Sequence, residues 1–176
     1  MAHLSRALSP FALFLLLAAS PAYAQNFDAM SVGELRSVVT DSHPSGYYVL
    51  ASKLYDEGER DEAVFWFYAG QLRYRTHLAC NPELTQDGDG ALFSALSEVI
   101  GSEINAYAFG DIDTLIQTID AVVAWDQSTP NSFGDDTDCG PAHDQVLAGL
   151  IDLKTYVSEN ADDVRIDRLA TGPIRP

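Results

Sequence analysis

Basic residues are scarce in this sequence of 176 residues, and their scarcity limits the partners that the protein can bind. Ten lysines and arginines stand against 26 aspartates and glutamates, which gives a formal net charge of −16 at pH 7. A surface of this sign repels phosphate backbones and anionic lipid head groups. Nucleic acid and anionic membranes are therefore excluded as partners, and the charge favours a cationic protein or a divalent metal ion.

Recognisable catalytic motifs are absent as well. The sequence has no G-x-S-x-G, no H-E-x-x-H and no glycine-rich phosphate loop. Among 26 acidic residues, neighbouring carboxylates occur by chance, and no pair stands out as a general acid and base. The sequence favours a protein that is not an enzyme and uses no cofactor. A hydrolase with an unrecognised carboxylate site is kept as a second alternative.

Long apolar stretches are missing except near the N-terminus, at residues 11–19. This stretch is shorter than the about 20 apolar residues that a membrane span needs. Ala22, Tyr23 and Ala24 follow it in the small-x-small pattern that signal peptidase recognises. Residues 1–24 are therefore predicted to be a cleaved signal peptide, and the mature protein is predicted to be periplasmic or secreted, with no membrane contact. Cleavage removes one basic and no acidic residue, which leaves 152 residues with net charge −17.

Cysteine occurs twice, at Cys80 and Cys139. In an exported protein an even pair most simply forms one disulfide, here closing a loop of about 60 residues. The alternative is a tetrahedral zinc site made by His77, Cys80, Cys139 and His143. The order and spacing of these four residues match no zinc-binding pattern, and an oxidising compartment favours the disulfide.

The remaining sequence predicts helices and no strands. Apolar residues recur with helical spacing over 32–41, 44–56, 61–79, 91–108, 112–127 and 141–159. Ser31 and Glu34 form a capping-box pattern, and Gly58 is placed as a glycine that ends a helix. We expect residues 25–160 to form an all-α, antiparallel bundle of five to six helices. Residues 161–176 are expected to form a polar C-terminal tail.

One predicted hairpin resembles a known repeat. Residues 48–70 read YVLASKLYDEGERDEAVFWFYAG and are similar to one tetratricopeptide-type unit, and more so to its Sel-like relatives, at Ala51, Leu54, Tyr55, Gly58, Asp61, Ala63, Trp66, Phe67 and Gly70. Such repeats are helical scaffolds for protein–protein contact, so the resemblance implies an α-hairpin in a binding module. It covers one unit, whereas a stable array needs about three.

The run of apolar residues at 64–68 is apolar on every side of its helix, which is typical of a helix enclosed by others. The alternative is a binding surface lined by aromatic side chains. Two arginines crowd the end of the same helix, where they either form internal salt bridges or bind an anionic group. The candidate binding surface is therefore made of Phe65, Tyr68, Leu72, Tyr47, Arg73 and Arg75.

These observations favour an exported, acidic, helical protein-interaction module, for example an inhibitor or immunity-type protein that binds a cationic partner. The alternative is a protein that binds a small ligand or a divalent metal ion such as calcium or zinc. Residues 87–90 resemble the start of a calcium loop, but Ala91 and Leu92 stand where a ligand and a glycine are required. Residues 135–138 are a second acidic candidate for weak calcium binding. The sequence leaves the oligomeric state open.

Overall fold

The computed structural model describes residues 26–84, 88–133 and 139–164. The predicted signal peptide with residue 25, residues 85–87, residues 134–138 and residues 165–176 lie outside these ranges. Within them the chain is all-α, with three short 3-10 helices and six α-helices: α1 Val32–Val38, α2 Ser45–Asp56, α3 Arg60–Cys80, α4 Asp89–Ala108, α5 Ile112–Ser128 and α6 Gly140–Glu159. The predicted all-α bundle is confirmed, and a short helical turn at 161–164 extends beyond the expected end at residue 160.

Local signals in the sequence set the helix boundaries. The Ser31 hydroxyl accepts from the Glu34 backbone N–H while the Glu34 carboxylate accepts from the Ser31 backbone N–H, so the predicted capping box begins α1. Gly58 has a φ of +89°, a conformation that disfavours residues with a side chain, and it ends α2. The Asp111 side chain accepts from the Thr114 backbone N–H and begins α5.

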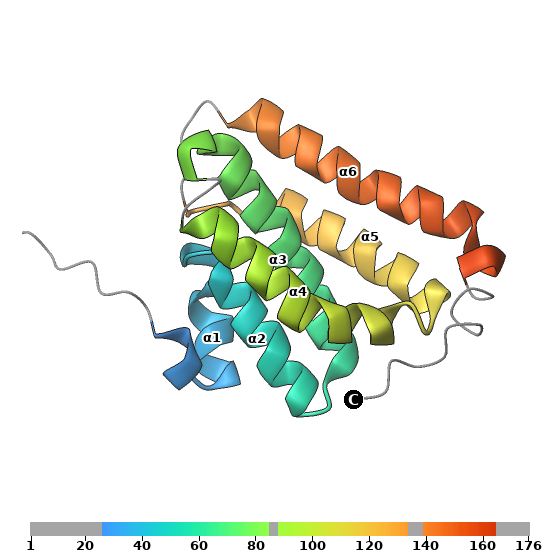
Figure 1. Ribbon diagram of the computed structural model, residues 1–176, viewed down its shortest axis with the longest axis horizontal. Helices are drawn as coiled ribbons and strands as arrows, with labels where there is room; N and C mark the ends of the chain where they lie inside the picture. The colour runs from blue at the N-terminus through green and yellow to red at the C-terminus, as the bar shows by residue number, and fades with distance from the viewer. Residues whose placement is uncertain (1–25, 85–87, 134–138, 165–176) are drawn as a thin grey trace, which may run out of the picture.

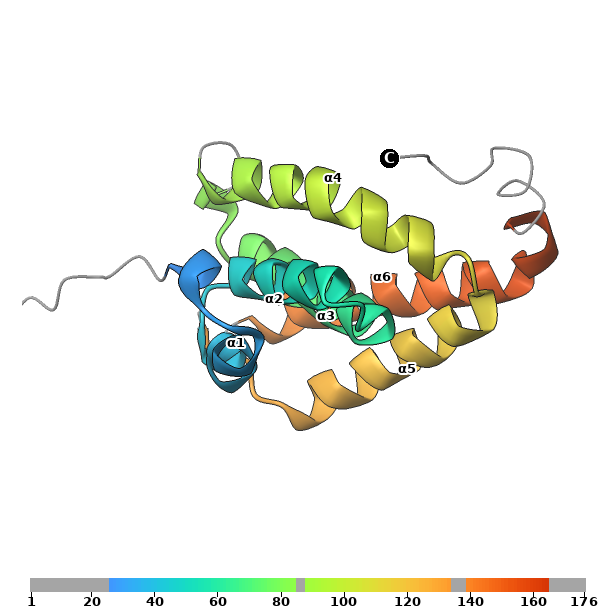
Figure 2. The ribbon, with the colours of Figure 1, turned by 90° about the horizontal axis from the view of Figure 1, so that it is seen from below.

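Helix α3 lies at the centre of the bundle. It contacts α2, α4, α5 and α6, and it forms its most extensive contact with the antiparallel helix α2. Figure 1 shows α4 and α6 on either side of α3, and Figure 2 shows α4 and α5 on opposite sides of the α2–α3 pair. The prediction that the helix carrying residues 64–68 is enclosed by others is therefore confirmed.

Aromatic rings fill the contacts that α3 makes. Phe67 meets Tyr48 of α2 edge to face, with ring centroids 5.6 Å apart. Phe65 and Trp66 both pack against Trp125 of α5, at centroid distances of 6.0 Å. Edge-to-face pairs at such distances add to the stability that comes from burial alone. The aromatic run on α3 is thus a structural core shared between neighbouring helices.

The close approach of α2 and α3 depends on Gly70. A Cβ atom at this position would lie 2.7 Å from the Cβ of Tyr47, which is fixed to the α2 backbone and cannot rotate away. We expect Gly70→Ala to lower the free energy of unfolding by about 2 kcal/mol, because the strain of overpacking exceeds the gain in helix propensity. Chemical denaturation monitored by circular dichroism measures the change.

The matched control is Gly149→Ala in α6. A Cβ atom at Gly149 has no neighbouring atom within 4 Å, so this substitution brings only the helix-propensity gain of about 0.5–1 kcal/mol. Opposite signs for the two variants are expected. A stabilising effect of Gly70→Ala would mean that Tyr47 Cβ lies farther from Gly70 than the structure places it.

Buried tyrosines make the fold sensitive to alkali. Burial raises the pKa of Tyr47 and of Tyr48 from 10.0 to about 12, and it also raises the pKa of Tyr68 and Tyr74. Because the folded pKa values lie above the unfolded ones, this contribution to stability is complete below pH 10 and is lost as the pH rises toward 12. Between pH 10 and 12 we expect the tyrosinate absorbance to rise and the helical circular dichroism signal to fall together.

The control for alkaline unfolding is Tyr47→Phe, which keeps the ring and removes the ionisable hydroxyl. Its alkaline unfolding midpoint is expected to lie above that of the unmodified protein. Ionisation of these tyrosines near pH 10 with the helical signal unchanged would contradict the assignment of their shifts to burial.

Candidate functional site

A groove of about 810 Å³ runs between α4 and α6, with α3 as its floor. α4 and α6 each have 20 residues and both pack on α3. The residues that line the groove are Phe67, Tyr68, Gln71, Leu72, Arg75, Ala79, Ser97, Asn105, Phe109, Gln145, Val146, Gly149, Leu150 and Leu153. They are mostly apolar, with a small number of polar groups, which is the usual composition of a binding site.

The candidate binding surface from the sequence is split by the structure. Tyr68, Leu72 and Arg75 line the groove, and the first two are buried in its floor. Phe65 and Tyr47 are absent from the groove lining and instead contact the rings of Trp66 and Trp125. The prediction of one continuous surface is wrong, because these residues leave α3 and α2 in different directions.

Polar side chains connect α3 to α4 inside the groove. The Gln71 side-chain amide nitrogen donates to the Ser97 hydroxyl at 3.1 Å, and Arg75 Nε donates to the Gln71 side-chain oxygen at 3.0 Å. The Tyr68 hydroxyl donates to the Asn105 side-chain oxygen at 3.0 Å. These bonds hold α4 at a fixed distance from α3 and leave the exposed guanidinium of Arg75 at the groove.

Arg73 faces the opposite way from Arg75 and is buried. Its guanidinium lies 3.2 Å from the Asp126 carboxylate, donates to the Thr129 carbonyl at 2.7 Å and stacks over Trp125. Asp126 is also buried and reaches the imidazole of His143 at 2.8 Å. Arg73 therefore forms an internal ion pair between α3 and α5, and its expected place on a surface is corrected.

The three histidines in the described residues lie at one end of the bundle, here called the histidine end. His43 precedes α2, His77 lies in the last turn of α3 and His143 lies in the first turn of α6. His43 and His77 both meet Asp89, the first residue of α4, with nitrogen–oxygen distances of 3.3 and 3.0 Å. One carboxylate thus joins the ends of three helical segments.

The two imidazoles change the ionisation of Asp89. Burial by itself would raise the pKa of this carboxyl, but the hydrogen bonds and charges of His77 and His43 outweigh burial and lower the pKa below its ordinary value. The folded pKa lies below the unfolded one, so the stability that Asp89 contributes is present at neutral pH and is lost as the pH falls through its folded pKa.

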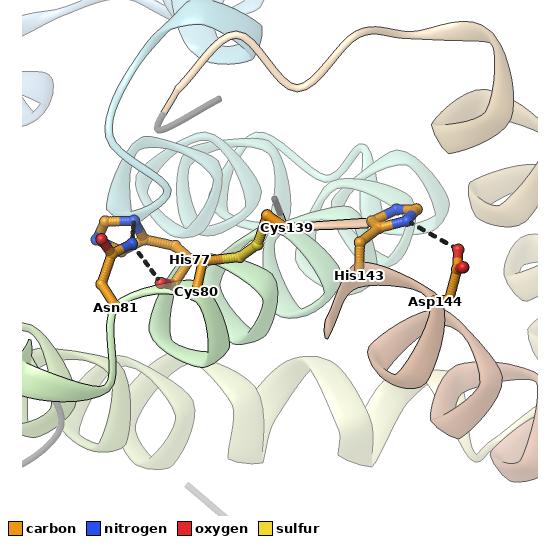
Figure 3. The surroundings of a disulfide bond; sticks show 6 residues. All are labelled: His77, Cys80, Asn81, Cys139, His143 and Asp144. Carbon is orange, nitrogen blue, oxygen red and sulfur yellow. Dashed lines mark hydrogen bonds and ion pairs between the residues drawn. A yellow bond between two sulfur atoms is a disulfide. The ribbon is translucent and has the colours of Figure 1, made fainter. Parts of the chain in front are cut away.

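Cys80 and Cys139 form a disulfide, as predicted, with Cα atoms 5.7 Å apart. Figure 3 shows it between the end of α3 and the start of α6, with His77 and His143 on either side. The alternative zinc site of His77, Cys80, Cys139 and His143 is wrong in this structure. Both sulfurs are used in the bond, and the two imidazoles face different carboxylates.

The acidic loops yield no calcium site among the described residues. Asp87 and residues 135–138 lie outside them, and the Asp89 carboxylate faces two imidazoles. A further hollow of about 370 Å³ beside α4 and α5 contains Asp61 and Asp111. Asp61 accepts from the Tyr107 hydroxyl at 2.7 Å, and Asp111 caps α5. The α4–α6 groove has no Asp, Glu or His in its lining.

Comparison with known proteins adds one related segment. No protein-family model and no solved structure matches the chain. A protein of Haemophilus influenzae, described as uncharacterized, is 37% identical over 90 residues, which cover 49% of this chain and 34% of the relative. The chain therefore matches about a third of the relative's length, and its function has to be inferred from its own side chains.

In residues 26–84, 88–133 and 139–164, no helix has both the length and the apolar character that crossing a bilayer requires.

Proposed function

We propose that this protein is an exported, acidic interaction module that binds an apolar segment of a cationic partner protein in the groove between α4 and α6. The observation that carries the proposal is the groove itself, because it combines apolar walls with a short row of polar side chains on a rigid floor. Grooves of this kind receive apolar side chains in their centre and polar contacts at their rim.

The charge of the chain supports a cationic partner. Exposed carboxylates are the sequence neighbours of groove residues on both walls. Glu98 follows Ser97 on α4, and on α6 Asp144 precedes Gln145 and Asp152 precedes Leu153. Opposite charges around an apolar centre speed the encounter of two proteins and fix their relative orientation. We infer that the partner presents lysines or arginines beside its apolar segment.

Export and the repeat resemblance belong to the same proposal. The apolar stretch at 11–19, the small-x-small pattern that ends at Ala24 and the Cys80–Cys139 disulfide support a protein that acts in the periplasm or outside the cell. The α2–α3 hairpin supports a tetratricopeptide-like or Sel-like origin for the scaffold. A concrete form is an inhibitor or immunity-type protein that neutralises a cationic toxin or hydrolase.

Gly149 provides a direct test, because it lines the groove and a side chain there meets no atom within 4 Å of its Cβ. Gly149→Phe is designed to place a ring at the wall of the groove, and an unchanged urea midpoint by circular dichroism verifies that the core is intact. Mature protein immobilised in low salt is used to capture partners from an envelope extract, and dissociation constants are then measured with the purified partner. We expect Gly149→Phe to weaken binding about tenfold or more.

The control is Gly149→Ala, which leaves most of the groove open and should bind as the unmodified protein does. Binding should also weaken with added salt, since exposed opposite charges are screened. A partner that binds Gly149→Phe with unchanged affinity would place the interface elsewhere. A partner that is itself acidic would contradict the electrostatic part of the proposal.

A further inference from the structure

The histidine end contains two carboxylates with similar surroundings and one important difference. Asp126 has one oxygen near His143 and the other near the permanently charged Arg73. Asp89 has one oxygen near His77 and the other near His43. At Asp126 a cation is therefore built into the fold. At Asp89 the position of that cation is taken by a second imidazole, which is a metal ligand in its neutral form.

The positions of the donor atoms suit a metal ion. One donor atom from each of His43, His77 and Asp89 can be chosen so that all three lie within 4.8 Å of one another. A nitrogen and an oxygen bound to the same zinc ion lie about 2.9–3.4 Å apart at bond angles of about 90–110°. His77 Nε2 lies 3.0 Å from Asp89 Oδ2 and His43 Nε2 lies 3.3 Å from Asp89 Oδ1, so a carboxylate that binds through both oxygens has the spacing of a coordinated pair at each imidazole.

The outer nitrogens of both rings also have partners. His43 Nδ1 lies 2.8 Å from the Ser45 hydroxyl, and His77 Nδ1 lies 3.4 Å from the side-chain amide of Asn81. Metal-binding histidines almost always donate their second ring N–H to such a neighbour, which fixes the ring orientation. The Ser45 hydroxyl can accept this proton directly. The Asn81 side-chain amide donates to the His77 backbone carbonyl at 2.8 Å, so it holds its place beside the His77 ring without accepting from it.

The ring contacts restrict the site further. His43 packs edge to face against Tyr74 and Phe133, and Phe133 also packs against His77. His77 lies one turn before Cys80, where the disulfide anchors the end of α3. The ligands are therefore supplied by three segments whose ends are held together by packing and by a covalent bond.

We propose that His43, His77 and Asp89 bind one zinc ion, with water completing its coordination. Two imidazoles and a carboxylate favour zinc over calcium, because calcium is bound by oxygen ligands. In the metal-free arrangement the Ser45 backbone N–H donates to His43 Nδ1 at 3.2 Å, which leaves the ring proton on Nε2. Zinc takes the Nε2 lone pair, so binding releases the Nε2 proton to solvent and Nδ1 takes up a proton. The Ser45 hydroxyl then accepts from Nδ1, and the Ser45 backbone N–H gives up its bond to this atom.

Calorimetric titration of the untagged, disulfide-intact mature protein with zinc chloride tests the site. We expect saturable binding of one zinc ion and none of calcium under the same conditions. Loss of even an outer partner of a ligand costs about 10–100-fold in metal affinity, so His43→Ala and His77→Ala should each lose more than about 100-fold. Ser45→Ala should lose about tenfold or more, within the same range.

The matched control is His143→Ala, which removes an imidazole–carboxylate contact at the same end of the bundle but no proposed ligand. It should bind zinc as tightly as the unmodified protein. Nitrogen NMR of the imidazoles provides a second readout on the unmodified chain, since zinc should convert His43 from its Nε2-protonated to its Nδ1-protonated form.

Three results would overturn the proposal. They are the absence of saturable zinc binding by the unmodified protein, unchanged affinity in His43→Ala or His77→Ala with native circular dichroism, and zinc binding without a change in the His43 signals. Each of these results is independent of the α4–α6 groove and leaves the proposed partner-binding function standing.

Discussion

Asp126→Asn is expected to lower the free energy of unfolding by about 3–5 kcal/mol, because it leaves the buried guanidinium of Arg73 without a counter-charge. Both side chains of this ion pair are almost fully buried, with 3% of the Arg73 side chain and 1% of the Asp126 side chain exposed. The asparagine can still accept one hydrogen bond, but it cannot neutralise the charge. Denaturation by urea, monitored by circular dichroism, measures the loss.

Asp120→Asn is the matched control, because it makes the same chemical change on the same helix. Asp120 pairs with Lys154 at the surface, where the effect of losing an ion pair is about 0–1 kcal/mol. The double variant Arg73→Met with Asp126→Leu should recover much of the stability lost in Asp126→Asn, since no buried charge is left. Equal, small losses in Asp126→Asn and Asp120→Asn would contradict the buried position of the Arg73–Asp126 pair.

Removal of the disulfide is expected to have a similar effect. Cys80 and Cys139 are separated by 59 residues in sequence, and in the chain-entropy model a cross-link over such a loop stabilises the folded state by about 4 kcal/mol. Cys80→Ser with Cys139→Ser should therefore unfold at a clearly lower urea concentration. Helical circular dichroism in the absence of denaturant should change little, because the bond lies at the ends of α3 and α6.

The reduced, unmodified protein is the control for the disulfide. It should match the double serine variant within error, since both lack the same cross-link. A double variant as stable as the oxidised protein would show that contacts between the unfolded segments, or strain in the folded chain, cancel the entropic gain. A reduced protein much less stable than the double variant would point to a cost of burying free thiols.

The sequence was sufficient to predict the helices but insufficient to predict most of their side-chain partners. Helical spacing and end signals such as Ser31, Gly58 and Asp111 depend on residues close together in the chain, so they can be read locally. The enclosed position of α3 also followed, because residues 64–68 leave no polar face. The disulfide followed from having two cysteines in a chain with a predicted export signal.

The side-chain partners of the two arginines could not be predicted from helical spacing. Arg73 and Arg75 are two positions apart on one helix, so they point in different directions, but the spacing does not show which of them meets α5. The sequence did contain one indication that a buried cation meets α5. Asp126 continues the apolar stripe of α5 through Ile119 and Val122, and a carboxylate in a buried stripe requires a cationic partner.

The histidine end was also missed, although its placement could have been inferred. His43 precedes a predicted helix, His77 lies near the end of the next one and His143 lies near the start of the last. In an antiparallel bundle, such positions fall at the same end. Spacing along the chain instead groups His77 and His143 with the cysteines, because each histidine stands within four residues of one. Only the directions of the helices bring His43 to the same end.

Val157 is the only buried residue of α6, although the helix is 20 residues long and carries Val146, Leu150 and Leu153 toward the groove. The disulfide joins the helix to α3 before its first turn, Val157 is buried near its last turn, and half-buried apolar side chains pack on α3 and α5 between them. The apolar surface between these attachments is still incompletely covered in the folded chain. If a partner binds in the groove as proposed, it completes the packing of α6 and adds to the stability of the folded state by RT ln(1 + [L]/Kd). The melting temperature, measured without added metal, is then expected to rise with the concentration of the partner.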